Sequence, residues 1–299
     1  MTLAPRQLAL LVGLTLAWGI NWPVMKLGVT HYPPLTFRAV SMLLGLPLLA
    51  AALWLQKLPF AVPRAHWREL ALLTVTNMFV WHLVVVLAIP HLSSGRAAIL
   101  GYTMPVFSAL WGLLVFGDRL RLRQALGVAA AALGVVLLLW HEFARVAGAP
   151  VAASAMLLAA AVWALGTRQL RATTIPLPTL TLSFWMTLAT AVAVCAAAAL
   201  FERAQWHWPN APARAAIAFN ALLVFGFAQV AWLVLARSLP PIASTLSVMM
   251  IPVLGTVGGA LALGEALHWQ DAAAAALMVA AIASVLWPAR TSAAGAPRG

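Results

Sequence analysis

The residues best able to do chemistry are a few polar and aromatic side chains that lie inside long apolar runs. Amide and hydroxyl groups offer hydrogen bonds, tryptophan rings offer stacking and cation–π contacts, and a histidine offers a proton near neutral pH. A polar group in lipid is costly and usually faces a cavity or a partner helix. We therefore expect the following residues to bind a ligand: Trp18, Asn21, Asn77, Trp81, His82, Tyr102, Trp163, Gln229 and Trp232.

His82 has two interpretations. It lies near Asn77 and Trp81, which share one helical face, whereas His82 shares its face with Met78 and Val85. In the first interpretation its ring hydrogen-bonds a neighbouring helix and fixes the packing. In the second it lines a cavity, where it is the one well-placed protonatable group. The sequence leaves both open.

Most of the 14 tryptophans lie near the predicted ends of apolar runs, where this residue is a typical interfacial anchor. Trp18, Trp81, Trp163 and Trp232 lie farther from those ends. Their position favours cavity lining. An aromatic wall suits an apolar or aromatic side chain, and it also attracts an ammonium group.

Charged residues add little inside the runs. All six carboxylates fall at predicted helix ends or in loops: Glu69, Asp118, Glu142, Glu202, Glu265 and Asp271. We therefore expect no buried carboxylate for proton coupling and no Arg–Asp pair to hold a zwitterion, which leaves Asn21 and Tyr102 to hydrogen-bond its ends. Cys195, the only cysteine, is expected to pack, and the sequence predicts neither a metal site nor a cofactor.

The elements that position these residues must be membrane helices, because 64% of the 299 residues are hydrophobic and only 8% are charged. The apolar runs are continuous and about 20 residues long, which fits spanning helices and excludes a β-barrel. Prolines and glycines mark their ends. The predicted spans are ten: 7–29, 34–55, 68–88, 95–116, 122–140, 150–171, 179–200, 213–236, 243–264 and 268–288.

The basic residues predict how the chain crosses the membrane. The net charge of +12 comes from Lys and Arg scattered singly, which argues against nucleic-acid binding. Short cytoplasmic loops are richer in Lys and Arg, so both termini are predicted to be cytoplasmic, in a bacterial inner membrane, with the first run retained. That orientation leaves few basic residues outside: Lys26, Arg38, Arg96, Arg145, Arg203 and Arg214.

An internal repeat divides the chain. A shift of 147 residues places Pro105 on Pro252, His82 on Gln229 and Gly117–Asp118 on Gly264–Glu265, and a shift of 145 places Trp18 on Trp163. Five helices per half would make the repeats inverted, as in secondary transporters, with a site between the halves. The predicted divisions are residues 1–147, residues 148–288 and a disordered cytoplasmic tail, 289–299.

Small residues and prolines inside the runs predict packing and bending. Pro105 and Pro252 are expected mid-helix, as hinges or as static bends. Gly255 and Gly259, together with the alanine-rich runs of the fifth and tenth helices, are expected to let helices pack closely. We interpret these small residues as structural.

Three segments carry a resemblance to a known family: 16–22 (Leu-Ala-Trp-Gly-Ile-Asn-Trp), the run through Pro105 to Gly117–Asp118, and the run through Pro252 to Leu267. They resemble the two EamA-type repeats of the drug/metabolite transporter superfamily. The resemblance implies ten helices, cytoplasmic termini and metabolite export. The chain looks most similar to the branch of amino-acid exporters that includes the aromatic amino-acid exporters.

The predicted function is therefore export of a small neutral metabolite, most of all an aromatic or other hydrophobic amino acid, by alternating access. Transport would be facilitative or weakly proton-linked. A multidrug or other metabolite exporter is the alternative, and an intramembrane enzyme is a distant one, because the sequence lacks paired carboxylates, a metal motif and a flanked nucleophile in the runs. The expected partners are the substrate and the lipid bilayer, and the sequence leaves a homodimer open.

Overall fold

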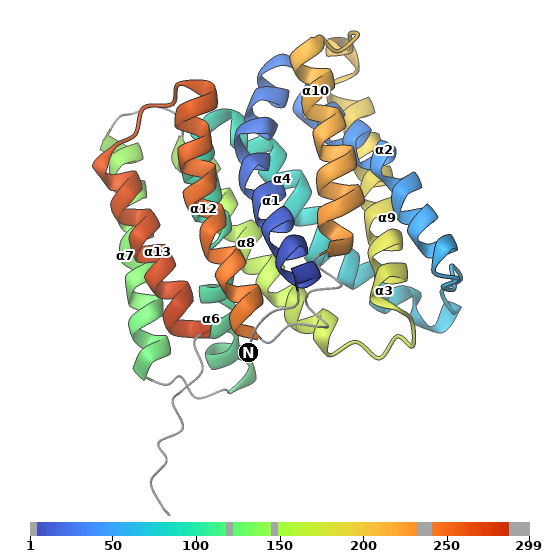
Figure 1. Cartoon of the computed structure of the whole chain (residues 1–299), viewed down its shortest axis with the longest axis horizontal. Coiled ribbons are helices and arrows are strands. Elements are labelled where there is room, and N and C mark those ends of the chain that lie inside the picture. Colours follow the sequence, from blue (N-terminus) through green and yellow to red (C-terminus); the bar gives the residue numbers. More distant parts are fainter. Residues whose placement is uncertain (1–4, 118–121, 145–148, 232–240, 287–299) are drawn as a thin grey trace, which may run out of the picture.

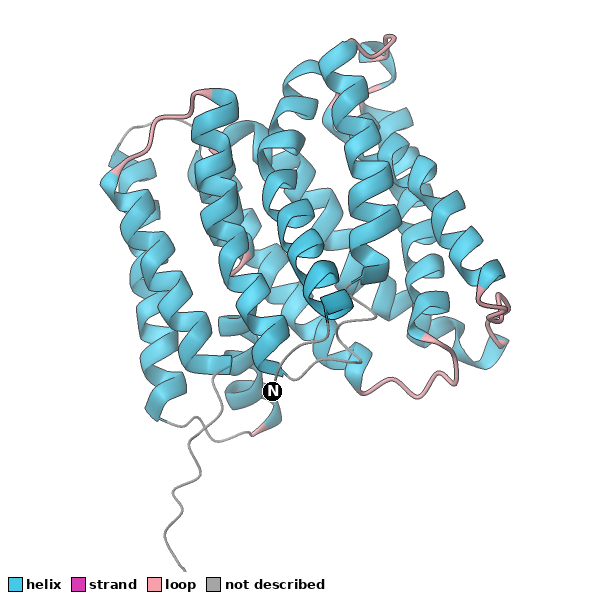
Figure 2. Cartoon of the chain, viewed as in Figure 1, coloured by secondary structure: helices cyan, strands magenta, loops and turns pink. Residues whose placement is uncertain are grey.

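The computed structural model describes residues 5–117, 122–144, 149–231 and 241–286 (Figure 1). Figure 2 shows helices joined by short loops, and the described residues form no strand. Seven helical runs in these residues are long and apolar enough to cross a membrane, and shorter apolar helices accompany them. The predicted tail, 289–299, lies outside the described residues.

The helices fall in the ten ranges that the sequence predicts. The first half contains α1 (Pro5–His31), α2 (Pro34–Leu55), the segment η1 (Arg64–His66), α3 (Trp67–Thr74), η2 (Val75–Phe79), α4 (Val80–Ala88) and η3 (Ile89–His91), then α5 (Ser94–Gly101), α6 (Met104–Phe116) and α7 (Leu122–Ala144). The second half contains α8 (Ala149–Arg171), α9 (Thr179–Phe201), η4 (Arg203–Gln205), α10 (Ala211–Phe219), η5 (Asn220–Ala228), α12 (Pro241–Leu263) and α13 (Trp269–Leu286).

The predicted helix 95–116 is not continuous, which corrects the expected role of one proline. Tyr102 and Thr103 separate α5 from α6, and Pro105 lies in the first turn of α6. A proline there removes no helical hydrogen bond, because the first N–H groups of a helix have no partner within it. Pro252 does lie inside α12, as predicted. The two prolines therefore are not an equivalent pair of mid-helix hinges.

Two π-helical segments, η2 and η5, interrupt the third span and the span that starts with α10. The shift of 147 residues that relates the halves carries Val75–Phe79 onto 222–226, which lies inside η5. Gly117 and Gly264, a predicted pair, follow α6 and α12 with φ values of 69° and 65°, a conformation that favours glycine. The repeat is thus visible in local backbone geometry.

The helix contacts repeat in the same way. Helix α1 packs against α12 and against α10 and η5, and α8 packs correspondingly against α5 and α6 and against η2 and α4. Helix α2 packs on its counterpart α9, and α7 on its counterpart α13; these pairs form the two flanks of the molecule in Figure 1. Exchanging the halves therefore reproduces the packing, as expected for a two-repeat architecture.

Small residues bring the predicted helix pairs together. A Cβ added at Gly255 would lie 2.8 Å from the Ala98 side chain of α5, and one at Gly127 of α7 would lie 2.9 Å from the Ala281 carbonyl oxygen of α13. Real Cβ atoms do not approach so closely, so glycine is needed at both places. The close packing expected at Gly255 is confirmed, and Gly127 lies one residue before the alanine-rich run that the sequence singled out.

Candidate functional site

Three tryptophans from three helices form a cluster between the halves. The rings of Trp81 in α4 and Trp163 in α8 have centroids 4.5 Å apart and are tilted by 36°. Trp22 of α1 meets Trp81 edge to face, at 6.4 Å and 87°. Gly101 at the end of α5 lies against both, since a Cβ there would be 2.9 Å from Trp81 and 3.1 Å from Trp22. Two of the predicted residues, Trp81 and Trp163, are therefore in direct contact, and Trp22 joins them.

Asn77 lies beside this cluster, also against α8. Its amide nitrogen donates to the Leu73 carbonyl oxygen at 3.1 Å, and a Cβ added at Gly166 of α8 would lie 2.8 Å from that nitrogen. Trp81 contacts α8 as well, so the expectation that Asn77 and Trp81 share a face is confirmed. Asn77 belongs to the π-helical segment η2, one turn before Trp81.

His82 lies on a different side of the same span. Its ring centroid is 5.4 Å from that of Phe225 in η5, and its Nδ1 atom is buried without a hydrogen-bond partner in the described part of the chain. The described contacts therefore do not include a hydrogen bond from His82 Nδ1 to a neighbouring helix, which the packing interpretation expected. The cavity role of His82 stays a prediction.

The sequence analysis placed Arg38 among the basic residues on the outer side of the membrane. In the structure its side chain lies inside the bundle and is only 1% exposed. Its Nη2 atom donates to the Met25 sulfur at 2.7 Å, and Nη1 to the Asn220 Oδ1 at 3.4 Å. Its guanidinium carbon is 5.8 Å from the centre of the Phe225 ring. The missed signal was a single arginine one turn inside an otherwise apolar helix, α2.

The other predicted residues lie in less distinctive places. Asn21 is 8% exposed, and its Oδ1 atom has no hydrogen-bond partner among the described residues. Tyr102 is buried after the last turn of α5, and Trp18 is half-buried against the core. Gln229 is half-buried just after η5. Trp232 lies outside the described residues, so its predicted role stays untested.

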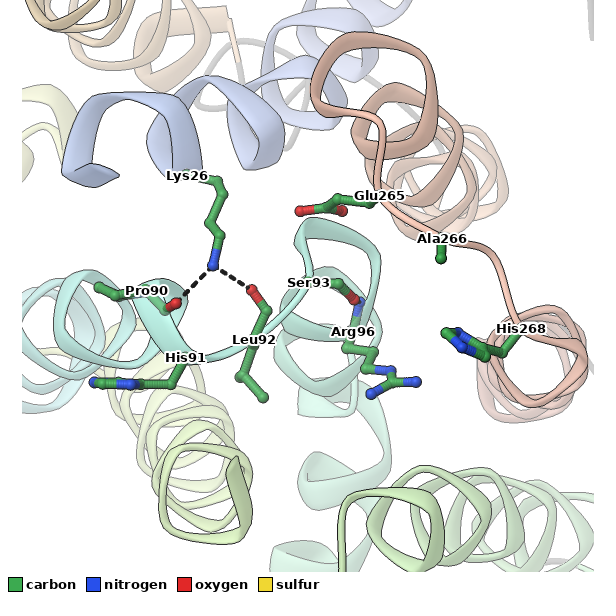
Figure 3. Close-up of a pocket in the computed structure, with 9 residues that line it drawn as sticks. All are labelled: Lys26, Pro90, His91, Leu92, Ser93, Arg96, Glu265, Ala266 and His268. Carbon is green, nitrogen blue, oxygen red and sulfur yellow. Dashed lines mark hydrogen bonds between the residues drawn. The ribbon is translucent and has the colours of Figure 1, made fainter. Parts of the chain in front are cut away.

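A pocket of about 320 Å³ opens at the end of the molecule where α1 finishes (Figure 3). The Lys26 ammonium points to the end of α4 and η3 and donates to the carbonyl oxygens of Ile89, Pro90 and Leu92 at 3.0, 2.6 and 2.9 Å. The Glu265 carboxylate accepts from the Ser94 backbone N–H, at the start of α5, at 2.9 and 3.0 Å. Lys26 thus binds carbonyl groups at the end of a helical segment, and Glu265 binds a backbone N–H group at the start of a helix.

One ion pair at this end adds to the sequence analysis. Arg96 Nε in α5 donates to Asp271 Oδ1 in α13 at 2.8 Å, with both side chains largely buried. The sequence did not predict this pair, because its partners lie far apart in the chain. The pair ties α5 to α13 and leaves little free charge on either group. The carboxylates whose side chains are described lie at helix ends or in loops, as predicted: Glu69, Glu202, Glu265 and Asp271. Glu202 and Asp271 are nevertheless buried at those ends, which the sequence did not predict.

Comparison with known proteins identifies the fold family. The sequence matches the EamA-like transporter family over residues 6–140 and again over residues 151–287. The chain belongs to this family. Its two matched stretches coincide with the two halves whose packing repeats, and this transporter is therefore a multi-pass membrane protein built from two EamA repeats.

Relatives across nearly the whole length are named as transporters. The transporter is 28% identical over 298 residues to the uncharacterized inner membrane transporter YedA of Escherichia coli, with 95% of each chain covered. It is 22% identical over 259 residues to the uncharacterized transporter YoaV of Bacillus subtilis, covering 85% and 88% of the two chains. The family and these names point to a transporter rather than to an enzyme.

Two further comparisons are more limited. A protein of Salmonella typhimurium named "Probable amino-acid metabolite efflux pump" is 30% identical over 164 residues, 53% of this chain and 50% of that one. A solved crystal structure superposes with a TM-score of 0.65 at 22% identity, over 94% of this chain and 96% of the other. The second comparison supports the fold alone.

Proposed function

We propose that the transporter exports neutral amino acids with aromatic or other hydrophobic side chains by alternating access. Transport of the substrate would be facilitative, or weakly coupled to proton movement through His82. The observation that carries this proposal is the contact between Trp81 and Trp163, because it places an aromatic surface at the meeting of the two halves. A secondary transporter binds its substrate at such an interface.

The chemistry of the cluster fits this substrate class. Stacked and edge-to-face rings accept a flat or branched apolar side chain, and their faces attract an ammonium group. Gly101 packs against the rings of Trp22 and Trp81, and the rings of the cluster contact one another. This packing fits a site that becomes accessible to substrate only when the two halves move apart. Partial similarity to the Salmonella efflux pump supports the same class.

A multidrug exporter is the alternative. Many such substrates are organic cations, and the buried guanidinium of Arg38 on α2 opposes a second cation in the bundle. An uncharged drug would not meet this obstacle. The amino-acid proposal is therefore favoured over cationic drugs, and the assay below includes both.

Counterflow in proteoliposomes tests the proposal. Vesicles are loaded with one unlabelled amino acid, the labelled form is added outside, and uptake is followed with and without a pH gradient. We expect transient accumulation with aromatic and branched amino acids. Trp163→Ala should raise the half-saturating concentration for aromatic substrates roughly tenfold, because stacking contacts and buried area are lost together.

The matched control is Trp140→Ala, the same substitution at a side chain of α7 that is 75% exposed. It should leave counterflow unchanged. Trp163→Phe should restore part of the lost affinity if the ring itself is used. Absence of counterflow with every amino acid, in monodisperse protein that exchanges an organic cation, would overturn the proposal in favour of drug transport.

A further inference from the structure

Arg38 is a cation buried inside the bundle. Among the described residues no carboxylate forms an ion pair with it, and its Nε atom has no hydrogen-bond partner. A guanidinium has five N–H donors, yet its hydrogen bonds within the described part of the chain go only to the Met25 sulfur and to the Asn220 side chain. An uncompensated charge inside a bundle is costly, and such residues commonly mark a substrate pathway.

The surroundings of Arg38 come from both halves. Met25 and Arg38 lie on α1 and α2, whereas Asn220 and Phe225 lie on η5. His82 of α4 presents its ring to the same Phe225 side chain, and its buried Nδ1 is also without a partner. Two nitrogen-bearing groups with unused hydrogen-bonding atoms thus flank one aromatic ring at the junction of the repeats.

This group adjoins the tryptophan cluster through two helices. On α1, Trp22 touches Trp81 and Met25 touches Arg38, and residues three apart lie on one helix face about 4.5 Å apart along the axis. On α4, Trp81 and its neighbour His82 face α8 and η5 respectively. An apolar surface and a cationic surface therefore lie about one helical turn apart.

We propose that Arg38 is the carboxylate-binding subsite of the transporter, with His82 Nδ1 as a second contact, and that the tryptophan cluster takes the side chain of the same molecule. This rests on the proposed function and specifies how the substrate is anchored. A guanidinium binds a carboxylate through two parallel hydrogen bonds, which would use the Nε atom that is now unpaired. Phe225 covers Arg38, and its place in a π-helical segment fits a movable cover, because such segments are frequent at functional sites.

The test compares a zwitterionic substrate with an analogue in which an uncharged carboxamide replaces the carboxylate, in the wild-type transporter. An aromatic amino acid and its carboxamide have the same side chain and amine, so they differ at the group that Arg38 would bind. In counterflow competition the amino acid should bind about tenfold or more tightly than the carboxamide. Arg38→Met should abolish this preference by weakening binding of the amino acid, whereas the carboxamide, a net cation, should bind no more weakly than to wild type. Arg38→Lys should retain part of the preference.

Arg214→Met is the matched control, since the Arg214 guanidinium is exposed and donates to the Pro209 carbonyl oxygen. It should keep the wild-type preference. Equal weakening of both ligands in Arg38→Met and Arg38→Lys would show that Arg38 only holds helices together and would overturn the proposal. The proposal is likewise overturned if the wild-type transporter binds the amino acid and its carboxamide equally well.

Chloride is the other anion that could occupy the guanidinium. Replacing chloride by gluconate should leave wild-type exchange unchanged, and a loss as large as that of Arg38→Met would overturn the carboxylate assignment. If wild type shows no amino-acid counterflow, the proposed function fails on its own. The subsite is then judged by thermal unfolding in detergent, where the aromatic amino acid must stabilise wild type more than its carboxamide does, and where absence of that difference overturns the subsite too.

Discussion

At the scale of single residues, burial and partners decide roles that residue type alone leaves open. The sequence singled out Trp81, Trp163 and Asn77 because they interrupt apolar runs far from their ends, and the structure places all three at the contact of α4 and η2 with α8. It did not single out Arg38, because a charge near a helix start resembles an interfacial residue. Two of its neighbours, Asn220 and Phe225, come from η5, about 180 residues away, and no local pattern indicates them.

The Arg96–Asp271 pair gives a prediction at this scale. Asp271 also accepts the His268 backbone N–H at 3.0 Å, so it serves both the ion pair and the start of α13. Asp271→Asn leaves the Arg96 guanidinium largely buried beside a neutral amide. We expect the free energy of unfolding to fall by about 3 kcal/mol, measured by denaturant titration in micelles. Adding Arg96→Gln should recover part of the loss, and an unchanged midpoint for Asp271→Asn would contradict the expectation.

At the scale of elements, the positions of the helices follow from length and hydrophobicity, but their internal breaks do not. Apolar composition places a helix over 95–116, yet α5 ends at Gly101 and α6 begins at Met104. The sequence did not predict the π-helical segments η2 and η5 either. Where every face of a helix is buried or in lipid, apolar residues occur all around it, so no hydrophobic period distinguishes a π-helix from an α-helix. Proline positions gave the ends of runs, but not which prolines lie inside a helix.

The contact of α5 with α12 gives a prediction about close packing. Gly255→Ala would bring its Cβ to 2.8 Å from Ala98, so the helices must separate, and we expect a loss of about 1–3 kcal/mol in unfolding free energy. Gly134→Ala on α7 is the matched control. Its Cβ would lie 3.5 Å from the nearest atoms of α13, an ordinary contact, and the better helix former should be neutral or stabilising by about 0.5–1 kcal/mol. Equal effects of the two variants would argue against this account.

At the scale of the whole molecule, the repeat was predictable and its consequences were largely correct. Matches such as Gly117 with Gly264 were weak individually, but their order implied two similar halves, and α1 with α12 and α8 with α5 and α6 form equivalent contacts. The orientation in the membrane has a different origin. It depends on where Lys and Arg lie during insertion, and the fold itself is compatible with either direction.

Cysteine labelling gives a prediction about that orientation. In a Cys195→Ala background, His91→Cys and Gln56→Cys each place a thiol at an exposed position, at opposite ends of the helical segment that connects them. If both termini are cytoplasmic, a membrane-impermeant maleimide should label His91→Cys in intact cells and Gln56→Cys only after permeabilisation. The reverse pattern would indicate the opposite orientation.

The burial of Arg38 also has an electrical side. A charge enclosed part-way through the bundle lies within the transmembrane voltage, and carrying one elementary charge fully across costs about 2.3 kcal/mol per 100 mV. A zwitterionic cargo adds no net charge, so steady exchange is electroneutral. Any displacement of α2 along the membrane normal nevertheless shifts Arg38 through the field. The resting voltage of the cell would then bias which side of the membrane the empty carrier faces.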